Sequence, residues 1–355
     1  MKTLFLLIFF PSICFSQQAY DYKNLVLEGG GVRGLAYAGV FSELEKNGIL
    51  QQIEKVAGTS AGAMAGVMIS VGYTANEIDS IVRTLPVERF NDGKGGIVGK
   101  YRRIRHKYGL YKGEKIELWI QQLIKHKTGD GNLTFAQLHQ LHLQNKIFID
   151  LFCTATNLSK QQLDIFSYEH TPDMSIALAV RISGGIPFYF EPVILDNQYK
   201  KIEKTDTLTE RNYYVDGGMI ANYPISIFDS CLNGRNPLQC DKLWFNPQTL
   251  GIKLERSAQI DSLKNNSSII PPFEIRSVKD YIHAFNNMVF ETMNRKYPTL
   301  ENEKKRTIYV SYGNVQSKVR KMKPEEKDLL YNNGVKAATD FLTSHQLLQP
   351  TIGGQ

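Results

Sequence analysis

The sequence predicts an α/β fold in which helices cover both faces of a central, mainly parallel sheet, giving three layers. Short apolar segments of strand length alternate with segments of helical period up to about Leu254. Strands that are connected through helices pair in parallel, and such sheets are buried on both faces. With 355 residues and 42% hydrophobic content, the chain is long enough to bury a core of this kind.

The first elements are two strand–helix pairs. An apolar strand at 25–27 is followed by a glycine-rich turn and by a helix at 35–46 that stops at Gly48. A second strand at 53–57 leads into a helix of small residues at 63–71. The pairs predict a parallel strand–helix–strand unit at the start of the sheet.

The middle of the chain elaborates this sheet. Residues 90–109 are rich in glycine and basic side chains without a clear period, which predicts a mobile insertion or cap. The elements expected after it are helices at 115–127 and 135–141, a strand at 147–156, a helix at 176–183 and a strand at 213–215.

The C-terminal third is expected to add layers to the same domain. Its predicted elements, after a polar stretch at 264–268, are a helix at 277–295, a strand at 307–311 and a helix at 324–342. The expected organisation is therefore a leader at 1–16, a main domain at 17–254 and a C-terminal elaboration at 255–355, packed on that domain.

The leader has the pattern of a secretory signal. Lys2 precedes an apolar run at 4–10, and small residues stand before Gln17. Cleavage there would leave an exported protein, periplasmic or secreted. A lipoprotein start at Cys14 is the alternative, although Ile13 is bulky where a small residue is expected.

Three cysteines remain after cleavage of the leader. Cys231 and Cys240 lie nine residues apart across a polar turn and could form a disulfide in an oxidising compartment; the sequence leaves this open. Cys153 stands in a mostly apolar run and is interpreted as a small buried hydrophobic residue. None of the three has metal-ligand spacing.

The net charge of +7 suits an anionic membrane surface as well as plain solubility. One segment concentrates the basic residues, and a peripheral contact with a membrane through it is a hypothesis beside that of a solvated loop. Its basic residues are Lys100, Arg102, Arg103, Arg105 and Lys107. Nucleic acid is disfavoured as a partner because no nucleic-acid-binding motif accompanies this cluster.

Two glycine-containing motifs follow the first two strands. The first consists of Gly29, Gly30, Gly31, Val32, Arg33 and Gly34. It fits a dinucleotide-binding pattern, but the acidic residue that such a site needs after the second strand is absent. That position instead holds a G-x-S-x-G motif with Gly58, Ser60 and Gly62, which places an exposed serine hydroxyl at a helix start.

A third motif, Asp216-Gly217-Gly218, follows the strand at 213–215. The three motifs in this order resemble those of patatin-like phospholipases. The resemblance runs from about Leu25 to Leu254 and includes the stretches 179–183 and 186–190. A small departure is Glu28, where many members of that family have another residue.

The resemblance implies a three-layer patatin-like fold and a serine esterase that cleaves phospholipids or other acyl lipids. Ser60 would be the nucleophile and Asp216 its general base, without a metal or cofactor. The oxyanion would be held by the glycine loop, residues Gly29, Gly30, Gly31, Arg33 and Gly34, with the amides of Gly30 and Gly31 as donors and Arg33 orienting the loop or a phosphate.

Two alternatives stay open. A Ser-His-Asp triad would need His283 or His345, which follow Asp216 in the chain. A lipid-binding protein without catalysis would keep the basic segment and an apolar cleft, but would not need all three motifs. The aromatic residues Phe188, Tyr189 and Phe190 are expected near an acyl pocket.

Overall fold

The computed structural model describes residues 21–347 except 204–209, 232–235, 241–242, 266–271, 279, 282–283, 286–287 and 289–300. The predicted leader at 1–16 and His283 lie outside the described residues, as does most of the helix expected at 277–295. Of the helices in the described ranges, none is both long and apolar enough to cross a lipid bilayer.

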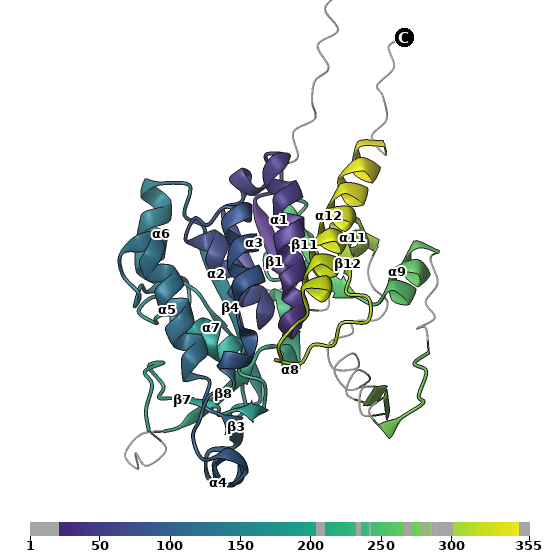
Figure 1. Ribbon diagram of the computed structural model, residues 1–355. Coiled ribbons are helices and arrows are strands. Elements are labelled where there is room, and N and C mark those ends of the chain that lie inside the picture. The colour runs from purple at the N-terminus through teal and green to yellow at the C-terminus, as the bar shows by residue number, and fades with distance from the viewer. Residues whose placement is uncertain are drawn as a thin grey trace, which may run out of the picture.

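The centre of the molecule is an eight-stranded sheet in the order β12-β11-β1-β2-β4-β8-β7, with β5 paired to β4 (Figure 1). Its strands are β1 (Asn24–Leu27), β2 (Lys55–Gly58), β4 (Asp150–Asn157), β5 (Gln162–Phe166), β7 (Val193–Leu195), β8 (Asn212–Asp216), β11 (Thr249–Glu255) and β12 (Thr307–Ser311). Two small ribbons lie apart from it, β3 (Gly109–Tyr111) with β6 (Phe188–Phe190) and β9 (Ser230–Cys231) with β10 (Leu243–Trp244).

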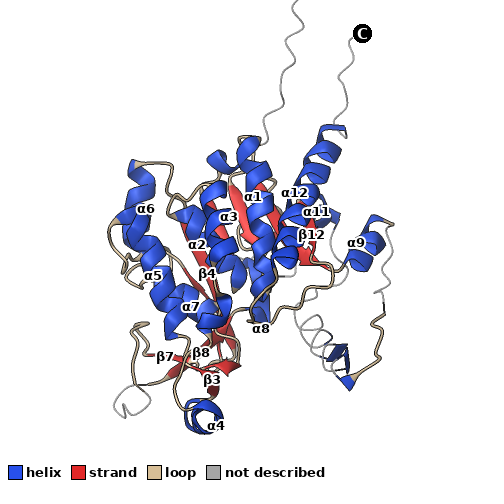
Figure 2. Cartoon of the chain, in the orientation of Figure 1, coloured by secondary structure: helices blue, strands red, loops and turns tan. Residues whose placement is uncertain are grey.

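Helices flank the sheet (Figure 2). They are α1 (Ala36–Lys46), α2 (Ala61–Ser70), α3 (Ala75–Thr84), α4 (Gly96–Lys107), α5 (Glu114–Thr128), α6 (Phe135–Gln144), α7 (Ile176–Ser183), α8 (Gly218–Ala221), α9 (Ser257–Lys264), α11 (Glu301–Lys305) and α12 (Pro324–Leu347). Short 3₁₀ turns occur at η1 (Gly31–Leu35), η2 (Leu50–Gln52), η3 (Val87–Phe90) and η4 (Pro237–Gln239). The predicted α/β class with a mainly parallel central sheet flanked by helices is confirmed.

Strand alternation divides the core between the two faces of the sheet. Leu25 and Leu27 point to the larger core, which also holds buried residues of α1, α2, α5, α7 and α12. Val26 points the other way, into a small cluster with Ala57 and Phe152 that is covered by the segment 223–228.

The pairing directions change at β4. Strands β12, β11, β1, β2 and β4 pair in parallel, whereas β8 is antiparallel to β4. β4 runs beyond the end of β2, since Gly58 is opposite Cys153 and the strand continues to Asn157. β8 returns along this extension, and Asp216 lies opposite Ala155. The end of β8 therefore comes back to the place where β2 ends.

The C-terminal region joins the sheet and its helical layer. β12 pairs with β11, and α12 lies so close to α1 that a Cβ at Gly39 would be 2.0 Å from the Tyr331 carbonyl oxygen. Between β12 and α12 the chain crosses the glycine loop as residues 312–319, here called the strap. An added Cβ at Gly31 would be 2.2 Å from the strap's Ser317 carbonyl oxygen.

The segment expected to be a mobile insertion or cap contains a regular helix, α4. None of its residues is buried. Its apolar residues have helical spacing, but the glycines at its start and the many basic residues around them obscured this period in the sequence. In Figure 1, α4 lies at the outer edge of the molecule beside β3.

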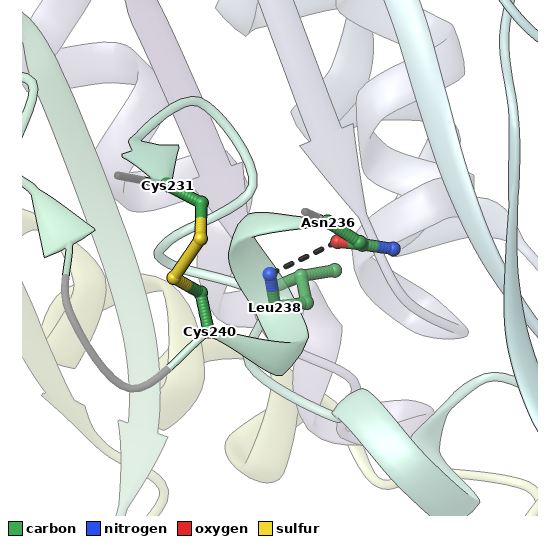
Figure 3. The surroundings of a disulfide bond; sticks show 4 residues. All are labelled: Cys231, Asn236, Leu238 and Cys240. Atoms are coloured by element: carbon green, nitrogen blue, oxygen red, sulfur yellow. Dashed lines mark hydrogen bonds between the residues drawn. A yellow bond between two sulfur atoms is a disulfide. The ribbon is translucent and has the colours of Figure 1, made fainter. Parts of the chain in front are cut away.

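Cys231 and Cys240 form a disulfide with a Cα–Cα distance of 6.0 Å (Figure 3). Within the bridged segment, the Asn236 side chain accepts a hydrogen bond from the Leu238 amide at 3.0 Å. Cys153 is buried and free, and burial raises the pKa of its thiol well above the ordinary value. The pairing that the sequence left open is present, and Cys153 is part of the core.

Candidate active site

Ser60 occupies a tight turn between β2 and α2. Its backbone has φ 53° and ψ −117°, an unfavourable conformation for a residue with a side chain, which such turns impose at functional sites. The two flanking glycines leave no room for a Cβ. At Gly58 it would be 2.4 Å from the Gly62 carbonyl carbon, and at Gly62 it would be 2.3 Å from the Leu27 carbonyl oxygen.

Ser60 and Asp216 are brought together, although they are far apart in the chain. The Asp216 carboxylate accepts hydrogen bonds from the Ser60 side chain and from the Gly218 amide at 2.8 Å. Burial raises the pKa of Asp216 to about 6, and the two hydrogen bonds oppose this rise. A buried carboxylate thus lies close enough to the serine hydroxyl for hydrogen bonding between them to lower its pKa.

The turn after Asp216 is closely packed against β4. A Cβ at Gly217 would be 2.3 Å from the Thr154 Oγ1 atom, so glycine is needed where the chain leaves β8. Thr154 also lies 2.6 Å from the Thr59 hydroxyl. Thr154 therefore contacts both Thr59, which precedes Ser60, and the turn that follows Asp216.

In the glycine loop the amides have different partners. The Gly29 N–H donates to the Asn222 carbonyl oxygen at 3.0 Å, so within the loop Gly29 has a structural contact and is not a further oxyanion donor beside the predicted Gly30 and Gly31. Within the described residues, no carbonyl oxygen accepts a hydrogen bond from the Gly30 or Gly31 amide. Gly34 instead serves packing, because a Cβ there would be 2.8 Å from that of Ala61.

Arg33 is directed toward the strap rather than toward Ser60. Its Nε donates to the Val315 carbonyl oxygen at 2.8 Å, and its guanidinium carbon lies 3.6 Å from the centre of the Tyr312 ring. Burial lowers the pKa of Arg33, and the nearby Tyr312 and Glu28 oppose this. These contacts fit an orienting role in the loop; no phosphate contact follows from them.

Glu28 and Asn222 connect the glycine loop to the segment after Asp216. The Asn222 amide nitrogen donates to Glu28 Oε1 at 3.3 Å and to the Gly29 carbonyl oxygen at 3.1 Å. Glu28 Oε2 accepts the Leu254 amide at 2.7 Å. No spacing in the sequence indicates this connection, although Glu28 is the departure from the family pattern.

Ser183 is a further residue of the site. Its Oγ accepts a hydrogen bond from the Ser60 amide at 3.0 Å, which holds the strained turn against the C-terminal end of α7. Ser183 belongs to the stretch 179–183 that supported the resemblance, but its contact with Ser60 depends on the packing of α7 and could not be inferred from spacing.

An apolar cavity of about 90 Å³ opens beside Ser60. Its walls include Met64, Met68, Trp119, Ile186, Phe190 and Val319. Of the three aromatic residues expected near an acyl pocket, Phe190 lines the cavity, the Tyr189 hydroxyl donates to the Asn91 side chain at 2.7 Å, and Phe188 is 74% exposed.

The histidine available for a triad is engaged elsewhere. The ring nitrogens of His345 lie 2.9 Å from the Phe341 carbonyl oxygen and 2.8 Å from that of Lys305. Asp216 contacts Ser60 without an intervening imidazole. In the described ranges, no three His, Cys, Asp or Glu side chains are grouped so that they could hold a metal ion.

The five basic residues of the predicted membrane segment all lie on α4, where they divide into two sets. Lys100 has its Nζ 4.7 Å from the centre of the Tyr111 ring. Arg103 donates to the Leu110 and Lys94 carbonyl oxygens at 2.9 and 2.7 Å. The other three, Arg102, Arg105 and Lys107, are exposed.

The sheet with its serine turn and the neighbouring glycine loop are those of an α/β hydrolase. The model of the patatin-like phospholipase family matches residues 25–229. The chain belongs to this family.

Similar proteins agree with this assignment. YqhO of Bacillus subtilis is 37% identical over 58% of this chain and 67% of its own length. "Probable lipid hydrolase 463L" of Invertebrate iridescent virus 6 is 30% identical over 64% of this chain and 70% of its own length. The crystal structure of VipD from Legionella pneumophila has the same fold, with a TM-score of 0.58, 20% identity and coverage of 92% of this chain and 68% of VipD. The chain thus spans about two thirds of each of these proteins.

Proposed function

We propose that the protein hydrolyses fatty acyl esters of phospholipids or other acyl lipids through a Ser60–Asp216 dyad. Membership of the patatin-like phospholipase family supports lipid hydrolysis in general. The observation that carries the dyad is the hydrogen bond from the Ser60 side chain to a buried Asp216 carboxylate whose pKa is raised to about 6.

The raised pKa bears directly on the chemistry. An ordinary aspartate, with a pKa of 3.8, is a weak base for a serine proton. A carboxylate with a pKa of about 6 is still ionised at neutral pH and is a better proton acceptor. Hydrolysis should therefore increase as the pH rises through about 6, because only the ionised form of Asp216 can act as the base.

The proposed reaction has two halves. The Ser60 oxygen bonds to the ester carbonyl carbon while Asp216 takes its proton; the tetrahedral intermediate then breaks its bond to the alcohol, which receives that proton. Water next attacks the acyl-serine, again losing a proton to Asp216, and the fatty acid leaves as Ser60 regains it. The amides of Gly30 and Gly31 are the proposed donors to the negatively charged oxygen.

We propose that the acyl chain enters the apolar cavity beside Ser60. The cavity volume of about 90 Å³ is smaller than the roughly 300 Å³ from which ligand pockets usually start, so its side chains must move when substrate binds. Met64 and Met68 line it, and methionine side chains adapt readily to such changes. Cleavage at acyl positions, the phospholipase A type, is the specificity expected of an acyl pocket at the nucleophile.

We propose that the protein is exported and meets its lipid at a membrane surface, in the periplasm or outside the cell. The disulfide between Cys231 and Cys240 supports an oxidising compartment. The exposed basic residues of α4 support a contact with anionic lipid. Mass spectrometry of the protein isolated from its cells would test the export, which predicts a chain that begins at Gln17.

The dyad is tested by hydrolysis of a short-chain chromogenic ester and of phosphatidylcholine vesicles. Ser60→Ala and Asp216→Asn should each lose activity, while His345→Ala and His283→Ala, the matched controls, should keep it. Equal loss in a histidine variant would contradict the dyad. Vesicle binding by a wild type that hydrolyses no ester would favour the non-catalytic lipid-binding alternative.

Acyl specificity requires a separate measurement. Phosphatidylcholine that carries different fatty acids at its two glycerol positions should release a free fatty acid and a lysophospholipid. Release of choline or phosphocholine in its place would contradict the phospholipase A type, while the ratio of the two fatty acids would give the preferred position.

A further inference from the structure

The outward face of α4 exposes large apolar side chains in its first turns. Ile97, Val98 and Tyr101 are 87%, 78% and 62% exposed. Tyr101 follows Val98 by three positions and Ile97 by four, so it lies beside both on the helix surface and joins the three into one apolar group. Single exposed apolar residues are common on soluble proteins, but a cluster of this kind indicates an interaction surface.

Basic residues continue the same face into the next turn. Arg102 follows Val98 by four positions, and Arg105 follows Tyr101 by four, which places each one turn further along the helix. Within the described part of the chain, no carboxylate lies within ion-pair distance of Arg102, Arg105 or Lys107. The outward face is therefore apolar at one end and cationic at the other.

Phe188 extends this surface beyond α4. It is 74% exposed and has a φ of 62°, so an unfavourable backbone conformation presents an aromatic ring to solvent. The ribbon of β3 and β6 places Phe188 opposite Gly109, two residues after the end of α4. The exposed ring adds nothing to the core, and the backbone conformation costs free energy. Together they indicate that Phe188 contacts a partner.

The same strand leads from this surface to the proposed acyl cavity. Phe190, at the other end of β6, is buried and lines the cavity beside Ser60. Two residues of a strand span about 7 Å. A partner that contacts Phe188 therefore lies close to the wall of the cavity, with only this short strand between them.

We propose that α4 and Phe188 form a docking surface for anionic lipid bilayers, with Ile97, Val98, Tyr101 and Phe188 inserted at the boundary between head groups and acyl chains. Arg102 and Arg105 would then contact lipid phosphates. This combination of apolar, aromatic and basic side chains is that of helices that lie in the membrane interface. The proposal rests on the proposed function for the nature of the substrate, and it adds insertion to the electrostatic contact.

Binding can be measured without hydrolysis in the Ser60→Ala background. We would use co-sedimentation with vesicles of phosphatidylcholine alone and of equal parts phosphatidylcholine and phosphatidylglycerol. One variant replaces Ile97, Val98 and Tyr101 with serine, and a second replaces Arg102 and Arg105 with glutamine.

The matched control combines Leu143→Ser on α6 with Lys125→Gln on α5. Leu143 is 57% exposed and Lys125 is exposed, so this variant removes an apolar and a basic surface residue away from α4. Unfolding midpoints of all variants would establish that each is folded.

The control should bind anionic vesicles as strongly as the parent. The serine variant should bind at least about tenfold more weakly at low and at high salt, because it loses inserted apolar area. The glutamine variant should lose about tenfold at low salt only, since salt screens its contribution.

Equal binding by the serine variant and the control would overturn the proposal, as would absence of binding by the parent protein. A loss confined to the glutamine variant would overturn insertion. Hydrolysis of the soluble chromogenic ester by the wild type reports on the proposed function separately, so an active enzyme that does not bind vesicles contradicts only the docking surface.

Discussion

Replacing Asp216 with asparagine should abolish hydrolysis and at the same time stabilise the protein. The pKa of the Asp216 carboxyl is about 6 in the folded protein, against 3.8 for an ordinary aspartate. Above pH 6 the carboxylate is charged in both the folded and the unfolded state, but only the folded state has removed it from water. The difference of about two pH units, at about 1.4 kcal/mol each, amounts to about 3 kcal/mol.

The sign of this effect depends on pH in a defined way. Because the folded pKa is raised, the destabilisation is complete above pH 6 and disappears as the pH falls below 3.8. An asparagine does not titrate, and its oxygen can still accept the Gly218 amide. Asp216→Asn should therefore raise the free energy of unfolding by about 3 kcal/mol at pH 8 and by less than about 1 kcal/mol at pH 4.

Urea unfolding of the oxidised wild type and of Asp216→Asn at both pH values measures this difference. Ser60→Ala is the informative control, because the Ser60 hydrogen bond lowers the pKa of Asp216 and its removal should destabilise the protein at pH 8. A gain in Asp216→Asn that is equal at pH 4 and pH 8 would refute the reasoning, since only a buried charge gives the pH dependence.

Three further predictions concern contacts outside the dyad. Arg306 donates two hydrogen bonds of 2.6 Å to the Asp229 carboxylate. Arg306→Met leaves Asp229 as a buried, unpaired charge and should lower the free energy of unfolding by about 3–5 kcal/mol in urea titrations. Replacing both residues with apolar ones should lower it less. Gly39→Ala should lower the thermal midpoint because the added methyl group meets the Tyr331 carbonyl oxygen. In a helix without this contact, the same substitution would raise the free energy of unfolding by up to about 1 kcal/mol. Arg33→Lys should lose about 1–2 kcal/mol in urea unfolding through the lost ring contact in the strap; an unchanged value would show that the charge alone is sufficient.

The sequence predicted the elements whose period reflects burial. The strand at 307–311 and the helix at 176–183 have the expected bounds, because their apolar side chains face the core. It also predicted that the glycine loop and the Ser60 turn lie together, because strand–helix turns at neighbouring ends of parallel strands meet at one edge of the sheet. That Asp216 joins them was predicted by the family resemblance alone.

Other features depended on packing that no local pattern records. The antiparallel pairing of β8 with the extension of β4 determines how Asp216 reaches Ser60. The sequence of a short apolar strand does not indicate whether the strand pairs in parallel or antiparallel. The Gly29 amide donates to the Asn222 carbonyl oxygen, and no spacing in the sequence connects these two distant residues. Helix α4 buries none of its residues, and the glycines at its start and its many basic residues obscured the helical spacing of its few apolar ones.

The strap has a consequence for the way such enzymes can be recombined. The match to the family model ends at residue 229. The side chain of Arg33 in the glycine loop is nevertheless held by Tyr312 and Val315, which lie beyond it. The stiffness of the loop is thus supplied by a part of the chain that the family signature does not describe. Chimaeras that exchange this part between relatives would keep every motif residue and still change how firmly the amides of Gly30 and Gly31 are fixed.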